Sequence, residues 1–500
     1  MFNNLKYYNK QLIYIKFIII LFLFWLSINT GSKYLDIQFL KENFSTNKLN
    51  FIRALLPYFI LIYLVIYNFY FKKKLFVLNF VFKLFIIYGL LQISGLVYYK
   101  QNLYEHYWVI CLFSLIFFYH FIAQEKNKNL INSIFYTNIF FIIIIFFIFI
   151  FITLKENILT PNLLYHSSAF NLQYQNEALP RSSGLSRMGL IIFLILNALY
   201  LSKNYSKKIN LLYIFSNIFV ISIILLLQSR GAILSFILIF ILINFLYKFE
   251  NFKNRFKFIL LFLIIPCLIF IIYPNSKNYL IEKYITKENF KSNPNKEIKI
   301  KNLEIRLRED LILNSNSNSN LKNKIYSFSN NRLDAWEYLL QMFFKNKINE
   351  NMKKKLEASS YSHLNFLKKE KKNILTGHGP QADRHFLHNK IVNVADSVLG
   401  PFGAHASNGY VYSLICSGLI GLVTFVMINI IILFKIFKII VYKKLGMFND
   451  EPLLSSSILI IIFLQFRLLI ENSFSVFGVD LLILISAYLI VNTKYKEINN

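Results

Sequence analysis

Apolar residues in this chain form long blocks that are separated by short polar stretches rich in Lys and Asn. A helix needs about 20 apolar residues to cross the roughly 30 Å hydrocarbon core of a bilayer, because lipid offers the backbone no hydrogen-bond partner. The pattern therefore predicts an all-α polytopic membrane protein with about 12 transmembrane helices, and the short block 188–201 allows that count to change by one or two. The predicted spans are residues 12–29, 50–71, 75–98, 107–123, 130–153, 188–201, 209–228, 231–247, 257–273, 409–434, 453–470 and 474–492.

The composition agrees with a membrane protein, since 56% of the residues are hydrophobic and only 16% are charged. Soluble domains have about 25% charged residues. Three cysteines, Cys111, Cys267 and Cys416, fall in or beside predicted spans. They are expected to be small buried apolar residues, and they indicate neither a disulfide framework nor a zinc site.

The distribution of Lys and Arg predicts the orientation of the chain, because cytoplasmic loops of membrane proteins carry an excess of these residues. With a cytoplasmic N-terminus, the short inner loops hold 20 Lys plus Arg and the short outer segments hold 9. Both termini are therefore predicted to be cytoplasmic. The predicted parts are helices 1–9 in residues 1–273, a large and mostly helical outer domain in 274–408, and helices 10–12 with a cytoplasmic tail in 409–500.

The charge of the chain bears on its partners. Much of the formal net charge of +30 lies in the cytoplasmic loops, where Lys and Arg contact anionic headgroups, so membrane lipids and no nucleic acid are predicted as partners. The outer segment 274–408 holds 23 Lys plus Arg against 13 Asp plus Glu, which suits an anionic ligand. Five of the eight histidines lie there, but their spacings fit no standard ligand pattern and the chain has no Asp-x-Asp pair. No metal and no cofactor are predicted.

Several motifs lie in or next to the outer segment. Residues 332–344 place Leu333, Trp336, Leu340 and Phe343 on one helical face, which can pack onto the membrane domain and direct Arg332 to the N-terminal end of the helix.

A turn and a histidine follow. Gly377–Pro380 predicts a turn from its glycines and proline. His405 lies immediately before the span that contains Gly418 and Gly421, and so at the water-facing mouth of that helix.

The order of these pieces resembles the O-antigen ligase and O-antigen polymerase superfamily, which joins sugars at the periplasmic face of Gram-negative inner membranes. Motifs carry the resemblance within roughly residues 180–425. In the rest of the chain it rests only on the number of predicted helices. The matching stretches are Pro180–Gly184, Gln228–Ala232, Arg332–Trp336, Gly377–Gly379 and His405–Gly421.

The resemblance implies a membrane glycosyltransferase that moves a glycan from a polyprenyl diphosphate donor to an acceptor hydroxyl. Cleavage of the sugar–phosphate bond develops negative charge on the diphosphate. The planar fork of arginine binds phosphate oxygens in pairs. Arg230 is the first candidate, because it lies in a short connection between two apolar blocks, and Arg181 and Arg332 match family positions that would complete the clamp.

His405 is the candidate general base, because an imidazole titrates near neutral pH. The family signature has His directly followed by Asn, Ser or Gln, nine residues and then Gly-x-x-Gly. Counted back from Gly418, the amide position is Asn408, a candidate substrate ligand, and the histidine position is Ser407. Either a shifted loop returns His405 to that place, or this chain does not use an imidazole.

Charged residues near the outer ends of the last two spans indicate a polar face there. Arg467 and Glu471 are four residues apart, so they are predicted to share a helix face and to pair. Asp480 lies in the outer half of the next span.

Three classes of function remain open. A ligase would use lipid A core as acceptor and a polymerase would use a growing glycan, with a slight preference for the ligase; transfer to protein is a related option. A lipid-linked glycan flippase or transporter would have polar groups near the bilayer midplane and repeated halves, which the chain lacks. A receptor or scaffold would tolerate substitution of Arg230 and Arg332.

Overall fold

The structure is a computed structural model, and every regular element in its described part is a helix. It describes residues 2–28, 35, 37–70, 78–99, 103–125, 127–159, 182–202, 207–227, 229–247, 252–272, 332–345, 349–350, 373–387, 406–443 and 450–499. The main helices are α1 (Phe2–Ser27), α2 (Ile37–Tyr70), α3 (Phe80–Tyr99), α4 (His106–Gln124), α5 (Lys128–Leu159), α6 (Ser182–Leu201), α7 (Lys207–Leu226), α8 (Arg230–Leu246), α9 (Phe252–Ile259), α13 (Arg332–Lys345), α15 (Ala382–Leu387), α16 (Gly409–Lys443), α18 (Pro452–Leu468) and α19 (Val479–Asn499). Two short 3-10 helices, η2 (Leu103–Glu105) and η8 (Ser473–Ser475), and a π-helical segment, η4 (Leu260–Ile264), complete the order.

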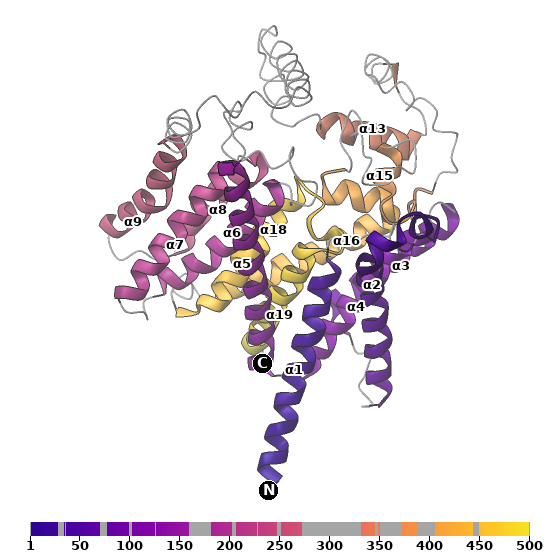
Figure 1. Cartoon of the computed structure of the whole chain (residues 1–500), viewed down its shortest axis with the longest axis horizontal. Helices are drawn as coiled ribbons and strands as arrows, with labels where there is room; N and C mark the ends of the chain where they lie inside the picture. The colour runs from indigo at the N-terminus through magenta and orange to yellow at the C-terminus, as the bar shows by residue number, and fades with distance from the viewer. Residues whose placement is uncertain are drawn as a thin grey trace.

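The bundle has two distinct ends. At one end, Lys128 of α5 pairs with Glu497 of α19, and Lys494 pairs with Glu451 at 3.0 Å. Both chain termini lie on this side in Figure 1, and α13 and α15 lie on the opposite side. We call these the termini end and the far end.

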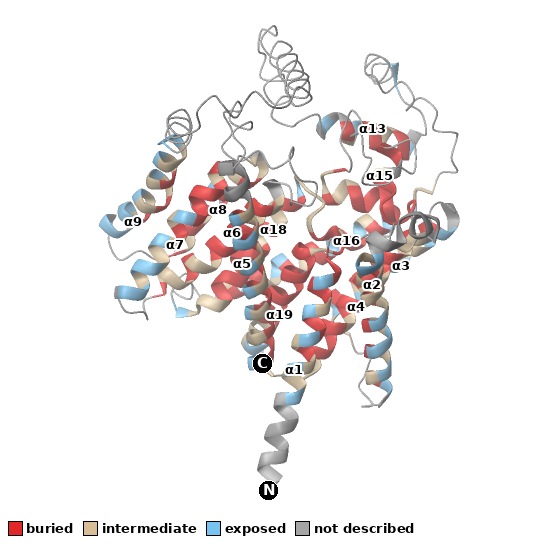
Figure 2. Cartoon of the chain, in the orientation of Figure 1, coloured by how far each residue is buried: buried red, intermediate tan, exposed pale blue. Residues whose placement is uncertain are grey.

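Helix α19 is the centre of the bundle. All fourteen residues from Val479 to Asn492 are buried, and α19 packs against α5, α16 and α18. Helices at the periphery instead have exposed stretches, which are pale blue in Figure 2. Their exposed residues include large apolar ones such as Phe59, Phe215 and Phe245. This is the arrangement expected of a chain whose outer surface contacts lipid.

Each of the twelve predicted apolar blocks overlaps a described helix. Eight helices in the described part are long and apolar enough to cross a membrane, which makes the chain a multi-pass membrane protein. Three more apolar helices are shorter, at Leu12–Ser27, Gly231–Leu246 and Pro452–Leu468. α19 carries Asp480 in its buried part, and Lys494 and Lys496 beyond that part, near the C-terminal end of the helix. The total of twelve crossings and the outside location of 274–408 stay predictions.

Helix α16 is broken at Gly418, which has φ 70° and ψ −170°. A loop formed by residues 373–379 inserts at the break. The backbone N–H groups of Leu419 and Ile420 donate to the carbonyls of Ile374 and Leu375, and those of His378 and Gly379 donate to Ile415 and Cys416. The loop thus satisfies the backbone groups that the break exposes, as burial within a membrane protein requires.

The glycines at this junction allow the close approach. A Cβ on Gly418 would clash with the carbonyl oxygen of Leu375, and a Cβ on Gly95 of α3 would lie 2.6 Å from the nitrogen of Gly379. Both Gly377 and Gly379 have positive φ, at 73° and 97°. The chain turns at Gly377–Pro380 as predicted, and these residues tie the segment 373–387 to α3 and α16.

We expect Gly418→Ala to lower the free energy of unfolding by about 2 kcal/mol or more, because a side chain there is strained by positive φ and by the clash with Leu375. The control is Gly478→Ala, since a Cβ on Gly478 meets nothing within 4 Å. The measurement is the fraction of monodisperse protein left in detergent after heating. Equal melting of the two variants would contradict the structural role of the junction.

Helix α13 confirms the helix predicted at 332–344 but corrects its buried face. Ala335, Tyr338, Leu339, Met342 and Phe343 pack in one apolar cluster with α15 and the first part of α16. Leu333, which the periodicity placed on that face, is 39% exposed. The buried residues keep helical spacing but on a neighbouring face, and Trp336 is only partly buried, with its indole Nε1 donating to the carbonyl of Ala406 at 2.5 Å.

Candidate functional site

The far end of the bundle brings the starts of four helices around the end of α18. Gly409 at the start of α16 lies against Leu468, and Gly231 at the start of α8 lies against Ile470. Asp480 at the start of α19 contacts Arg467 of α18 and Arg187 of α6. Helix N-termini carry a partial positive charge of roughly half a unit each, so this arrangement favours anions.

Asn408 fixes the start of α16 to this end of α18. Its Oδ1 accepts hydrogen bonds from the backbone of Tyr410 at 2.9 Å and Val411 at 3.1 Å, which makes it the N-cap of the helix. Its backbone N–H donates to Oδ1 of Asn472 at 3.1 Å, and its Nδ2 donates to the carbonyl of Leu469 at 3.0 Å. Asn408 therefore holds three segments together.

A buried ionic group lies beside this junction. Asp480 accepts from Nε of Arg467 at 3.0 Å and from Oγ of Ser473 at 2.9 Å, and its second oxygen is 3.2 Å from Nη1 of Arg187. The Asp480 and Arg467 side chains are only 3% and 8% exposed, and that of Arg187 is 18% exposed. Nε of Arg187 is buried without a hydrogen-bond partner among the described residues. The Nε–H of Arg187 is therefore a buried donor that none of the described contacts uses.

α18 ends at Leu468, but the backbone N–H of Glu471 donates to the carbonyl of Arg467 at 2.8 Å, so a further helical turn joins the two residues. Arg467 also pairs with Asp480 on α19, a partner that the sequence did not predict. Glu471 is close enough to Arg187 to attract its charge. The polar, inward face predicted near these residues is present.

The sequence-predicted site residues fall in three groups. Asn408 is fully described at the end of α18. Arg230 and Arg332 are the first residues of α8 and α13, and their side chains lie outside the described part of the chain. Arg181 and His405 lie outside the described residues, one before α6 and one before Ala406.

Sequence reasoning missed Arg187, Asn472 and Asp383. Arg187 stands directly before the predicted span 188–201, and a charge so close to an apolar block was the available signal. Asn472 lies between Arg467 and Asp480 but gives no local pattern. Asp383 is fully buried and accepts the backbone N–H of Ala406 at 2.8 Å, a contact across 23 residues that no local spacing could indicate.

Burial shifts the pKa of two titratable groups in the segment 373–387. Burial lowers the pKa of His378 to about 4, so its imidazole is neutral at pH 7. The ring packs edge-on against Phe343 and Phe386, with centroid distances of 5.7 and 5.1 Å. Burial raises the pKa of Asp383, an effect that the backbone N–H of Ala406 opposes.

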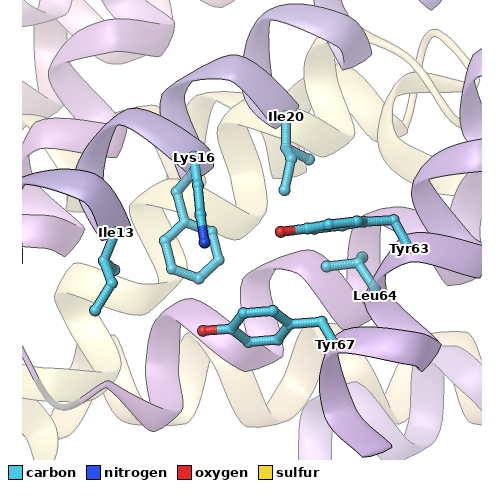
Figure 3. Close-up of a pocket in the computed structure, with 7 residues that line it drawn as sticks. Ile13, Lys16, Ile20, Tyr63, Leu64 and Tyr67 are labelled. Carbon is cyan, nitrogen blue, oxygen red and sulfur yellow. The ribbon is translucent and has the colours of Figure 1, made fainter. Parts of the chain in front are cut away.

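A small pocket between α1 and α2 does not belong to this site. Figure 3 shows Lys16 and the hydroxyls of Tyr63 and Tyr67 around it, with apolar side chains such as Ile13 and Leu64 completing the lining. None of the candidate residues lines it.

Within the described helices and loops, no group of three or more His, Cys, Asp or Glu residues could hold a metal ion. No family model, no curated protein and no solved structure matches this chain.

Proposed function

We propose that this chain is a membrane glycosyltransferase that moves a glycan from a polyprenyl diphosphate donor to an acceptor hydroxyl at the periplasmic face of the bacterial inner membrane. The activity is metal-independent and O-antigen ligase-like, with lipid A core as acceptor; elongation of a growing glycan is the polymerase alternative. The observation that carries the proposal is the gathering of the starts of α6, α8, α16 and α19 around the end of α18, together with Arg187 and Arg467.

The chemistry of the donor explains why such a site is useful. Transfer breaks the bond between the anomeric carbon and the diphosphate oxygen, and the electron pair remains on the diphosphate. Fixed positive groups in a water-poor environment stabilise that developing charge. In the proposed site, Arg230, Arg181 and Arg332 bind the diphosphate oxygens, and the helix starts beside α18 add their partial charges.

The acceptor hydroxyl must lose its proton as it attacks. His405 is the proposed general base, and it directly precedes the Ala406 peptide that Asp383 and Trp336 bind. His378 is unsuited to this role, because its low pKa makes it a weak base and its ring is enclosed by aromatic side chains.

The periplasmic assignment is supported by charge. Lys and Arg in the predicted inner loops outnumber those in the short outer segments, 20 to 9. Lys128, Lys438 and Lys494 all lie at the termini end, whereas the ionic group of Asp480 lies at the far end.

The test is deletion of the gene followed by gel analysis of surface polysaccharide. A ligase predicts loss of all long chains on the lipid core while lipid-linked polymer accumulates. A polymerase predicts lipid core that carries a single repeat unit. A ladder identical to that of the parent strain refutes the proposal.

The broken helix α16 is the feature that a transporter would share, because transporters bind substrates at unwound helix segments. Here the loop 373–379 occupies the break and supplies hydrogen bonds to Leu419 and Ile420. The backbone groups of the break are thus used internally, which favours the enzyme over the flippase.

A further inference from the structure

The backbone N–H and the backbone carbonyl of Ala406 are each bound by a side chain from another element. Its N–H donates to Oδ2 of Asp383 in α15 at 2.8 Å, and its carbonyl accepts Nε1 of Trp336 in α13 at 2.5 Å. Ala406 and Asp383 are both 0% exposed. Both backbone groups of this residue are bound by side chains from two other elements, so its position is closely defined.

The two elements that hold Ala406 are themselves anchored. α15 follows the Gly377–Gly379 turn, whose backbone is bound to α16 at Ile415 and Cys416. α13 packs through Tyr338 and Phe343 into the same apolar cluster as Ile415. Displacement of Ala406 would therefore require movement of α13 or α15 relative to α16.

On the other side of Ala406, the chain continues to the proposed site. Ser407 has a left-handed backbone with φ 50°, and Asn408 is bound to Leu469 and Asn472. The side chain of Asn472 is also close enough to Asp383 to stabilise its charged form. Asp383 thus acts on both ends of the segment 406–408.

A carboxylate at a fully buried position destabilises the fold unless hydrogen bonds compensate, because burial disfavours its charged form. Asp383 receives the Ala406 hydrogen bond on one oxygen, and its other oxygen has no hydrogen-bond partner among the described residues. An apolar residue would fill the same space at lower cost. The carboxylate is therefore explained by the peptide that it binds.

We propose that Asp383 is a positioning residue that fixes the segment 406–408, which follows His405 in the chain, relative to the end of α18. The catalytic consequence rests on the proposed glycosyl transfer, whereas the position of the segment can be tested without it. Asp383 contacts no substrate in this proposal and acts through the Ala406 peptide.

The experiment measures the accessibility of the segment directly. Ser407→Cys is introduced into the full chain with Cys267→Ser, because Cys111 and Cys416 are buried. We expect maleimide to label Ser407→Cys about tenfold faster in Asp383→Ala than in the parent, since the variant loses a buried hydrogen bond. Asp383→Asn should restore slow labelling, because its amide oxygen can still accept from Ala406. Asp450→Ala, an exposed carboxylate before α18, is the matched control and should leave labelling unchanged.

The readouts separate the two proposals. Glycan transfer should fall about tenfold in Asp383→Ala and recover in Asp383→Asn, in parallel with labelling. Unchanged labelling in Asp383→Ala overturns the positioning role, whatever the activity. Faster labelling with undiminished transfer also overturns it, because the segment would then not serve the reaction.

A normal polysaccharide ladder after gene deletion refutes the glycosyltransferase alone. If Asp383→Ala does not fold, Trp336→Phe removes the donor to the carbonyl of Ala406 and should raise labelling in the same way.

Discussion

Arg230→Ala is expected to reduce surface glycan assembly roughly 100-fold, while the amount of protein in the membrane stays unchanged. In the proposed mechanism the guanidinium meets charge that develops on the diphosphate, and loss of one such donor raises the barrier without affecting the fold. Arg230 is the first residue of α8, and its neighbour Gly231 lies against Ile470, so its backbone is at the end of α18. The measurement is the polysaccharide ladder in a deletion strain that expresses each variant, with immunoblots for protein level.

The matched control is Arg255→Ala. Arg255 is also an arginine next to an apolar helix, but its Nη2 donates to the carbonyl of Asn244, away from the end of α18. We expect its ladder to equal that of the parent. Arg332→Ala should resemble Arg230→Ala, and His405→Ala should abolish transfer if the imidazole is the base. Parental ladders from both arginine variants would eliminate the diphosphate clamp.

Asp480→Ala is expected to destabilise the protein by about 3–5 kcal/mol, because it leaves the guanidinium groups of Arg187 and Arg467 buried without their shared carboxylate. The measurement is thermal aggregation of the purified protein in detergent. Asp480→Asn should be similarly harmful, since it keeps the shape but removes the charge.

The triple variant Arg187→Met, Arg467→Met and Asp480→Leu separates stability from function. Replacement of a whole buried ionic group by apolar residues is often neutral or stabilising. We expect the triple variant to have a melting temperature close to that of the parent. It should nevertheless lose glycan transfer, because the unused Nε–H donor of Arg187 is removed. Parental activity in this variant would assign the group a purely structural role.

Much of the membrane architecture could be predicted from the sequence, because lipid imposes length and polarity on every span. The blocks at 107–123 and 130–153, for example, coincide closely with α4 and α5. The block predicted at 474–492 overlaps α19, but hydropathy alone could not predict that this helix is buried on all sides at the centre of the bundle. The buried face of α13 was also misassigned: Ala335, Tyr338, Leu339 and Met342 have helical spacing and are buried, whereas Leu333, which was predicted on that face, is 39% exposed.

The site was predictable only in part. Asn408 was found by counting back from Gly418 in the family signature, but its role as the N-cap of α16 was not predicted. The pairing of Asp480 with Arg187 joins residues from α19 and α6, and the contact of Asp383 with Ala406 depends on the loop at Gly377. Such contacts are fixed by tertiary packing, so no spacing along the chain encodes them.

The break at Gly418 has a consequence for biogenesis. The loop 373–379 that completes α16, and Gly95 of α3 that receives this loop, both precede α16 in the chain. When α16 leaves the ribosome and enters the insertion machinery, the segments that repair its backbone have already been synthesised. Assembly can thus proceed in the direction of translation. In a circularly permuted chain that began at α16, the backbone groups at the Gly418 break would stay without hydrogen-bond partners until the loop 373–379 had been synthesised.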